Sequence, residues 1–440
     1  MAEKPTKATI FTYQVGFGDC FLLRFDYASK QRHVLIDFGT TKLPEGASKN
    51  HMIDVANDIG EKCGGRLDAV VATHRHADHI SGFATNAAGN ASGDIIRGLK
   101  PKLVVQPWTE NPKLATDSTG PAATRSPALR GYLQSLGFMH SIASELTQML
   151  DSPSAKTFTP ALREQLGFLG EDNLSNASAV KNLMTMAKNK YVFHGSPSGL
   201  DALLPGVKVS VLGPPTLKQT DTISAQRSKD KDEFWNLARL CLAQDAGLSA
   251  GVDDLFPHSP GIPGRKAPLD ARWLAERLKN MRTEQMLQLV RILDKQMNNT
   301  SIILLIEAGS KKLLFPGDAQ LENWQYTLNQ PKWLKALIDV DVYKVGHHGS
   351  TNATPKSLWN NFENRGKPSK KDRLQTVMST LPGKHGSEDR GTEVPRIPLV
   401  KALKSQSTLY ATTDLGVNDR YTQLDLKFVE TTRTARFPKK

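Results

Sequence analysis

Residues 73–79, with the sequence THRHADH, constrain this chain more than any other stretch. They follow the apolar run 67–72, which is typical of a buried strand. Side chains of a loop can point in different directions, so the first two histidines can reach one metal ion, and the aspartate and last histidine a second. Imidazole and carboxylate ligands suit zinc, manganese or iron better than magnesium. The predicted ligands are His74, His76, Asp78 and His79.

The length and composition predict a globular protein with a sizeable core, since 39% of the 440 residues are hydrophobic. No window approaches the roughly 18 consecutive apolar residues of a membrane helix, and the N-terminus leads into no apolar signal segment. We therefore expect a cytoplasmic protein without a membrane partner. The three cysteines, Cys20, Cys63 and Cys241, are far apart in sequence, and we expect reduced, mostly buried thiols.

The formal net charge of +13 favours attraction to polyanions. Nucleic acid, either DNA or RNA, is therefore a possible partner. No known nucleic-acid motif identifies particular binding residues.

Hydrophobic periodicity predicts an α/β protein in which a core is interrupted twice. Residues 1–107 form the first half of the core, with strands near 9–11, 20–25, 33–37, 67–72 and 102–107 and a helix near 51–63. A mainly helical insertion follows at 108–206, then a core strand at 207–214 and a second helical insertion at 215–297. Residues 298–430 form the second half of the core, and 431–440 form a basic tail. Either insertion could receive a protein partner.

Two aspartates of the first half are candidates for supporting the metal ligands. Asp37 ends an apolar strand, where it can hydrogen-bond a ligating histidine or its loop, or simply form a turn. Asp19 ends the segment 15–19, VGFGD, whose glycines allow the backbone to turn tightly toward the site.

Two later motifs also follow predicted strands. Asp318, in the segment 315–318 (FPGD), is our candidate for a carboxylate between two metal ions. Adjacent histidines at a strand end diverge, so one of His347 and His348 can ligate a metal while the other contacts substrate or a second metal. One ligand beside one bystander is the alternative.

The order of these motifs resembles the metallo-β-lactamase superfamily, whose signature His-x-His-x-Asp-His matches residues 74–79 completely. Within it the chain is similar to ComEC-like domains over about 1–107 and 298–430, in a stand-alone form without a membrane part. The resemblance implies an αββα sandwich, here with two mainly helical insertions. It also implies two divalent ions, zinc or manganese, and hydrolysis through a metal-bridged hydroxide.

Some positions depart from the family pattern. Phe17 stands where these domains usually carry glutamine, and the turn 298–301, NNTS, stands where many superfamily members have a ligand histidine. Asn299 is then a neighbour of the site, and the first metal is bound more weakly or is completed by His347, His348 or another group. His385 is a candidate ligand or proton donor, as in ComEC-like domains. The catalytic candidates are thus Asp78, His348 and His385.

Three functions compete on these grounds. The leading hypothesis is a phosphodiesterase acting on nucleic acid, that is, a nuclease. The second is a hydrolase of a small phosphodiester or ester, as in phosphorylcholine esterases and lactonases of this fold. The third is a regulatory module with a degraded metal site, motivated by the asparagines at 298–299.

Overall fold

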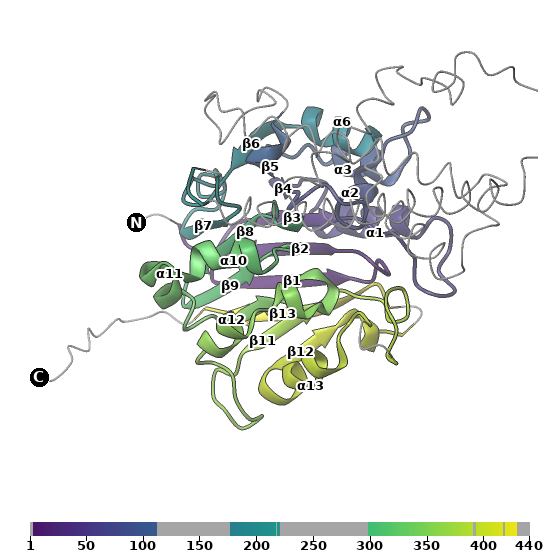
Figure 1. Ribbon diagram of the computed structural model, residues 1–440. Helices are drawn as coiled ribbons and strands as arrows, with labels where there is room; N and C mark the ends of the chain where they lie inside the picture. The colour runs from purple at the N-terminus through teal and green to yellow at the C-terminus, as the bar shows by residue number, and fades with distance from the viewer. Residues whose placement is uncertain are drawn as a thin grey trace, which may run out of the picture.

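The computed structural model describes residues 3–111, 177–216, 218–220, 298–389, 393–416 and 419–428 (Figure 1). Thirteen strands form two sheets within these ranges. The insertions expected at 108–206 and 215–297 lie largely outside the described residues, as do the basic tail and Cys241.

The first sheet has seven strands in the order β13-β1-β2-β3-β4-β5-β6. β13, β1, β2 and β3 run antiparallel, and β3 to β6 run parallel. The strands are β1 (Lys7–Tyr13), β2 (Cys20–Asp26), β3 (Gln31–Phe38), β4 (Ala69–Val71), β5 (Leu103–Pro107), β6 (Lys188–Val192) and β13 (Tyr421–Lys427). β4 and β5 are buried along their whole length, as expected of parallel strands covered on both faces.

The second sheet repeats this plan with six strands in the order β12-β11-β10-β9-β8-β7. β7, β8 and β9 run antiparallel, and β9 to β12 run parallel. The strands are β7 (Val207–Gly213), β8 (Ile303–Ala308), β9 (Lys311–Phe315), β10 (Val342–Lys344), β11 (Gln375–Met378) and β12 (Thr408–Ala411). Each sheet thus consists of an antiparallel meander extended by three parallel strands.

Helices cover the outer face of each sheet (Figure 1). The helices near the first sheet are α1 (His51–Lys62), α2 (Ala77–Ile80), α3 (Ser92–Gly98) and α6 (Ala177–Thr185). Those near the second sheet are α10 (Leu321–Leu328), α11 (Pro331–Ala336), α12 (Lys356–Asn361) and α13 (Ile397–Gln406). Val55 and Ile59 of α1 lie one turn apart and pack on the first sheet, and Trp324 of α10 and Leu403 of α13 pack on the second.

The inner faces of the two sheets share one hydrophobic core. Ile10 and Ile36 of the first sheet belong to the same cluster as Leu304 and Leu313 of the second. The architecture is therefore α/β, with two sheets packed face to face between helical layers.

One expected boundary is wrong. We expected 108–206 to be an insertion, but β6 pairs in parallel with β5, and α6 packs in the layer of α1 and α3. Residues 177–192, which carry α6 and β6, therefore belong to the core rather than to an insertion. β6 has the sequence KNKYV, and this edge strand lacks the apolar run by which buried strands are predicted.

In the part of the chain that the structure describes, no helix combines the length and apolar character needed to cross a membrane. Cys20 and Cys63 are buried free thiols, as expected.

His33 of β3 gives a testable pH dependence. It is 3% exposed, and burial lowers its pKa from 6.5 to about 4, so the folded protein holds it neutral. As pH falls below about 6.5 the unfolded chain takes up this proton first. Above about pH 6.5 this titration does not reduce the free energy of unfolding. The free energy of unfolding then falls progressively as pH drops from about 6.5 to about 4, where the folded protein also takes up the proton.

We expect lowering pH from 7 to 4.5 to cost the wild type about 2–3 kcal/mol more unfolding free energy than His33→Gln, which cannot titrate. Urea denaturation of both proteins at each pH measures this difference. Parallel pH profiles would contradict the assignment, because all other titrating groups are common to the two proteins.

Candidate metal centre

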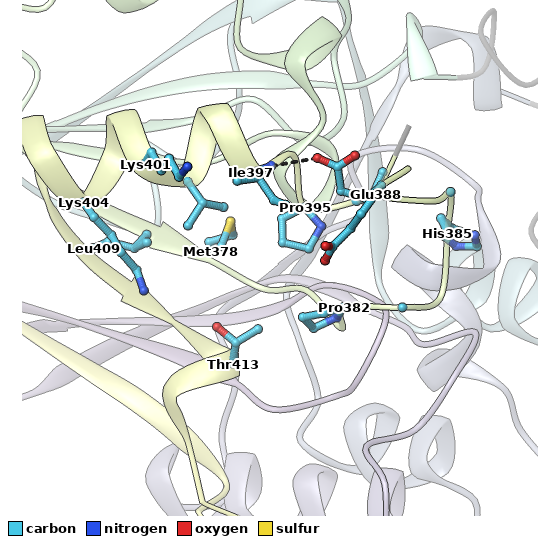
Figure 2. A pocket seen from close by; sticks show the side chains of 15 residues that line it. Met378, Pro382, His385, Glu388, Pro395, Ile397, Lys401, Lys404, Leu409 and Thr413 are labelled. Carbon is cyan, nitrogen blue, oxygen red and sulfur yellow. Dashed lines mark hydrogen bonds between the residues drawn. The ribbon is translucent and has the colours of Figure 1, made fainter. Parts of the chain in front are cut away.

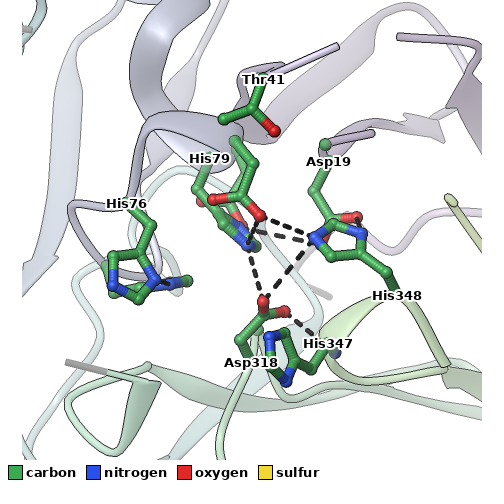
Figure 3. Close-up of polar contacts among 12 residues, drawn as sticks. Asp19, Thr41, His76, His79, Asp318, His347 and His348 are labelled. Carbon is green, nitrogen blue, oxygen red and sulfur yellow. Dashed lines mark hydrogen bonds and ion pairs between the residues drawn. The ribbon is translucent and has the colours of Figure 1, made fainter. Parts of the chain in front are cut away.

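Four buried side chains from three distant segments form the centre of the site (Figure 3). Asp78, His79, Asp318 and His348 each offer one ligand atom, and these atoms lie within 4.8 Å of one another. The Nε2 atom of His79 lies 3.0 Å from Oδ2 of Asp318, and Nε2 of His348 lies 2.7 Å from Oδ2 of Asp78. The structure thus brings together four residues that the sequence predicted as ligands.

The segments meet because both sheets end their parallel strands at the same place. Asp78 and His79 lie in α2 after β4, Asp318 follows β9, and His348 follows β10. The carboxyl ends of parallel strands share one sheet edge, and the two stacked sheets bring their edges together.

Two glycines allow the loops to approach α2 closely. A Cβ atom on Gly18 would lie 2.8 Å from the carbonyl oxygen of Asp78, and one on Gly39 would lie 2.5 Å from the amide nitrogen of His79. Asp19 accordingly donates its backbone N–H to the Asp78 carbonyl at 2.9 Å. Only glycine fits at these two positions, because any other residue has a Cβ atom.

The backbone at the double histidine adopts an uncommon conformation. His347 and His348 both have positive φ, 45° and 52°, as does Asp37 at 55°. Such values are strained for residues with a Cβ atom and concentrate at functional sites. The turn directs His348 into the cluster, while His347 uses its backbone N–H to donate to Oδ1 of Asp318 at 3.0 Å.

The other two predicted ligands lie beside this cluster. The Nε2 atom of His74 is 2.9 Å from Nδ1 of His76, and the His74 ring centroid is 4.1 Å from that of His79. Burial, together with the charge of His79, lowers the pKa of His74 well below 6.5, so the imidazole is neutral, as metal ligation requires.

Asp37 connects the metal loop to β3, and it contacts both the histidine and the loop that were predicted as alternatives. Its Oδ2 atom lies 2.8 Å from Nδ1 of His79, and its Oδ1 atom accepts the backbone N–H of Thr73 at 2.7 Å. The hydroxyl of Thr73 also donates to Asp37. A carboxylate behind a ligating histidine fixes the orientation of its ring and leaves Nε2 for the metal.

Lys344 is the main residue that the sequence reasoning missed. This lysine of β10 is 2% exposed, and its Nζ atom contacts Asp19, lies 3.3 Å from Oδ1 of Asp318 and donates to the Gly317 carbonyl at 3.0 Å. Burial by itself lowers the pKa of Lys344, but the two carboxylates outweigh it and hold that pKa above its ordinary value. A lysine inside an otherwise buried strand is the signal that could have identified it.

The charges of the cluster are strongly coupled. Burial raises the pKa of Asp78, but the neighbouring charges of His79 and His348 outweigh it and hold that pKa below its usual range. His79 shows the converse effect, because Asp318, Asp78 and Asp37 raise its pKa against the effect of burial.

The turn 298–301 lies beside the metal loop and Asp318, and the contacts come from Ser301 and the following Ile302. Ser301 accepts the backbone N–H of Asp318 at 3.2 Å, and Ile302 donates to the Thr73 carbonyl. Asn299 instead donates to Glu322 of α10 at 3.0 Å.

Phe17 packs against two histidines. Its ring centroid lies 4.3 Å from that of His348 and 4.2 Å from that of His385. Burial, reinforced by the charge of Lys384, lowers the pKa of His385 to about 2, so His385 is a neutral imidazole. His385 thus packs on the same Phe17 ring that contacts His348.

The donor set fits a metal ion. The ligand atoms are imidazole nitrogens and carboxylate oxygens, and Oδ1 of Asp78 is buried with no hydrogen-bond partner among the described residues. Asp78 and Asp318 are at most 5% exposed, and their ligand atoms lie within 4.8 Å of each other. Two buried carboxylates at this distance need positive charge nearby. The cluster could therefore hold a metal ion.

Comparison with known proteins adds nothing to this description, since no protein-family model matches the chain and no curated protein matches its sequence.

Proposed function

We propose that this chain is a metal-dependent hydrolase with the metallo-β-lactamase αββα fold that cleaves phosphodiester bonds, with nucleic acid as its substrate. The buried cluster of Asp78, His79, Asp318 and His348 carries the proposal. The helix-covered pair of sheets and the net charge of +13 support it.

The side chains divide into two donor sets around Asp318. His74 and His76 would hold one ion, and Asp78, His79 and His348 would hold the other. Oδ1 of Asp318 already contacts Lys344 and the His347 backbone, so Oδ2, which lies 3.0 Å from His79, is the atom available to both sets. Two such ions, zinc or manganese, would polarise a phosphoryl oxygen and would supply a nucleophile at neutral pH when bound.

The protein's own residues orient these ligands. Asp37 fixes the ring of His79, and the Ser379 carbonyl lies 3.0 Å from Nδ1 of His348, so in both rings Nε2 faces the cluster. His385, held neutral, packs on Phe17 and lines the neighbouring cavity, and in this arrangement it would contact substrate rather than the ions.

Cleavage of labelled single- and double-stranded DNA by wild type and Asp78→Ala, with manganese added, tests the proposal. We expect the wild type to cleave and the variant to lose at least about 100-fold in rate, because Asp78 supplies a ligand to one ion. Asp341→Asn, which removes a carboxylate paired with Lys311 outside the cluster, is the matched control and keeps its activity. A wild type that holds metal yet leaves DNA and RNA intact would contradict the nuclease assignment.

A hydrolase of a small phosphodiester or ester is the second candidate. A cavity of about 620 Å³ next to His385 favours it, because this volume suits a small molecule. Cleavage of small chromogenic diesters without cleavage of nucleic acid would select this candidate.

A further inference from the structure

A cavity of about 620 Å³ opens between α13, the end of β11 and the segments 382–388 and 393–395 (Figure 2). Its walls are mainly apolar, and its largest apolar side chains are those of Met378, Pro395, Ile397, Val400 and Leu409. It has the size and character of a pocket for a single ring system rather than for a folded partner.

The cavity adjoins the metal centre. His385 lines it and packs on Phe17, whose ring contacts His348. Gly349, directly after His348, packs against two of its wall residues, since a Cβ atom there would lie 2.7 Å from Pro395 and 3.2 Å from Met378. The cavity is therefore in contact with the metal centre through the rings of Phe17 and His385 and through Gly349.

Charge is distributed unevenly along the cavity. Lys401 and Lys404, one turn apart on α13, line the end away from His385 and are exposed (Figure 2). Glu393 accepts from Arg396 and from the backbone of Ile397, and Glu388 also lines the cavity. The cavity thus offers cations at one end for a phosphate and a carboxylate that can accept from an amino group.

We propose that this cavity binds one unpaired nucleotide of the substrate, next to the phosphodiester at the metal centre. The apolar walls cover the faces of the base, Lys401 and Lys404 bind its phosphate, and Glu388 accepts from a base amino group. This inference rests on the proposed function and deepens it, because a paired base cannot enter such a pocket. The substrate class is then single-stranded nucleic acid, or an unpaired stretch of it.

Fluorescence anisotropy with a labelled ten-nucleotide single strand, in EDTA to prevent cleavage, tests the proposal. We expect the single strand to bind at least about tenfold tighter than a hairpin duplex of equal length, since base stacking and burial are lost in the duplex. Lys401→Ala/Lys404→Ala should weaken single-strand binding about tenfold. The matched control is Lys332→Ala/Lys335→Ala, which removes two exposed lysines of equal spacing on α11 and should leave binding unchanged.

Thr413→Trp distinguishes binding inside the cavity from binding to the positive charge of the surface alone. Thr413 is exposed and lines the cavity, so tryptophan fills the space without disturbing the core, and we expect at least about tenfold weaker binding. Equal binding of single strand and duplex, equal effects of the two lysine pairs, or normal binding by Thr413→Trp would each overturn the proposal.

Cleavage and binding measurements together distinguish an error in the hydrolase assignment from an error in the cavity assignment. If manganese-loaded protein does not cleave while the binding pattern holds, the cavity assignment stands and the hydrolase assignment fails. If the protein cleaves but binding ignores Lys401, Lys404 and Thr413, the hydrolase assignment stands and the cavity assignment fails.

Discussion

Replacing Lys344 by methionine is expected to lower the free energy of unfolding by about 3–5 kcal/mol, the usual cost of removing one partner from a buried ion pair. Lys344 is buried between the carboxylates of Asp19 and Asp318, both 0% exposed. Methionine conserves the volume but leaves these two carboxylates facing each other without the ammonium. Equilibrium denaturation in urea, on metal-free protein, measures the loss.

Lys208→Met is the matched control for this prediction. Lys208 also forms an ion pair, with Glu307, but its side chain is 69% exposed, and surface pairs contribute at most about 1 kcal/mol. Adding a divalent metal should restore part of the stability of Lys344→Met, since the ion brings positive charge to the same carboxylates. An unchanged denaturation midpoint in Lys344→Met would show that Asp19 and Asp318 are not held by this lysine.

The second large effect is expected from Asp318→Asn. The amide keeps the shape of the side chain but removes the one carboxylate that lies between the two proposed donor sets. We expect metal affinity and cleavage each to fall by more than about 100-fold, beyond the range usual for residues that only orient a ligand. Metal content after dialysis, measured by plasma mass spectrometry, and cleavage rates give the two readouts.

The control for Asp318→Asn is again Asp341→Asn, because Asp341 bonds Lys311 and the Lys312 backbone rather than any residue of the cluster. Full metal retention in Asp318→Asn would mean that this carboxylate is not a ligand. Loss of metal in both variants would point to a general loss of structure instead.

The sequence predicted the strands well because most of them are short apolar runs bounded by glycine or polar turns. The segments 20–25, 33–37 and 207–214 correspond to β2, β3 and β7 within about two residues. β6 was missed, because an edge strand can satisfy its pairing with polar side chains. A hydrophobic pattern reports burial, and a strand with little burial leaves little pattern.

The cluster was predictable where its candidate ligands are close together in sequence. His74, His76, Asp78 and His79 form a local motif, and Asp37 was placed correctly by its position at a strand end. The choice between His347 and His348 was not predictable, since it depends on two residues with positive φ. Lys344 was missed for a related reason: its partner Asp19 belongs to the other sheet, and only the packing of the sheets brings the two charges together.

The repeated plan of the two sheets has a consequence for how the chain acquires its activity. Asp78 and His348, in contact at 2.7 Å, are 270 positions apart and belong to different repeats. Closing so long a loop has an entropic cost, and an ion held by both residues would stabilise the closed arrangement. Neither sheet with its loops carries the whole proposed donor set. Metal binding would therefore require that both sheets have folded and packed together, and a truncated chain with one sheet would have no hydrolase activity.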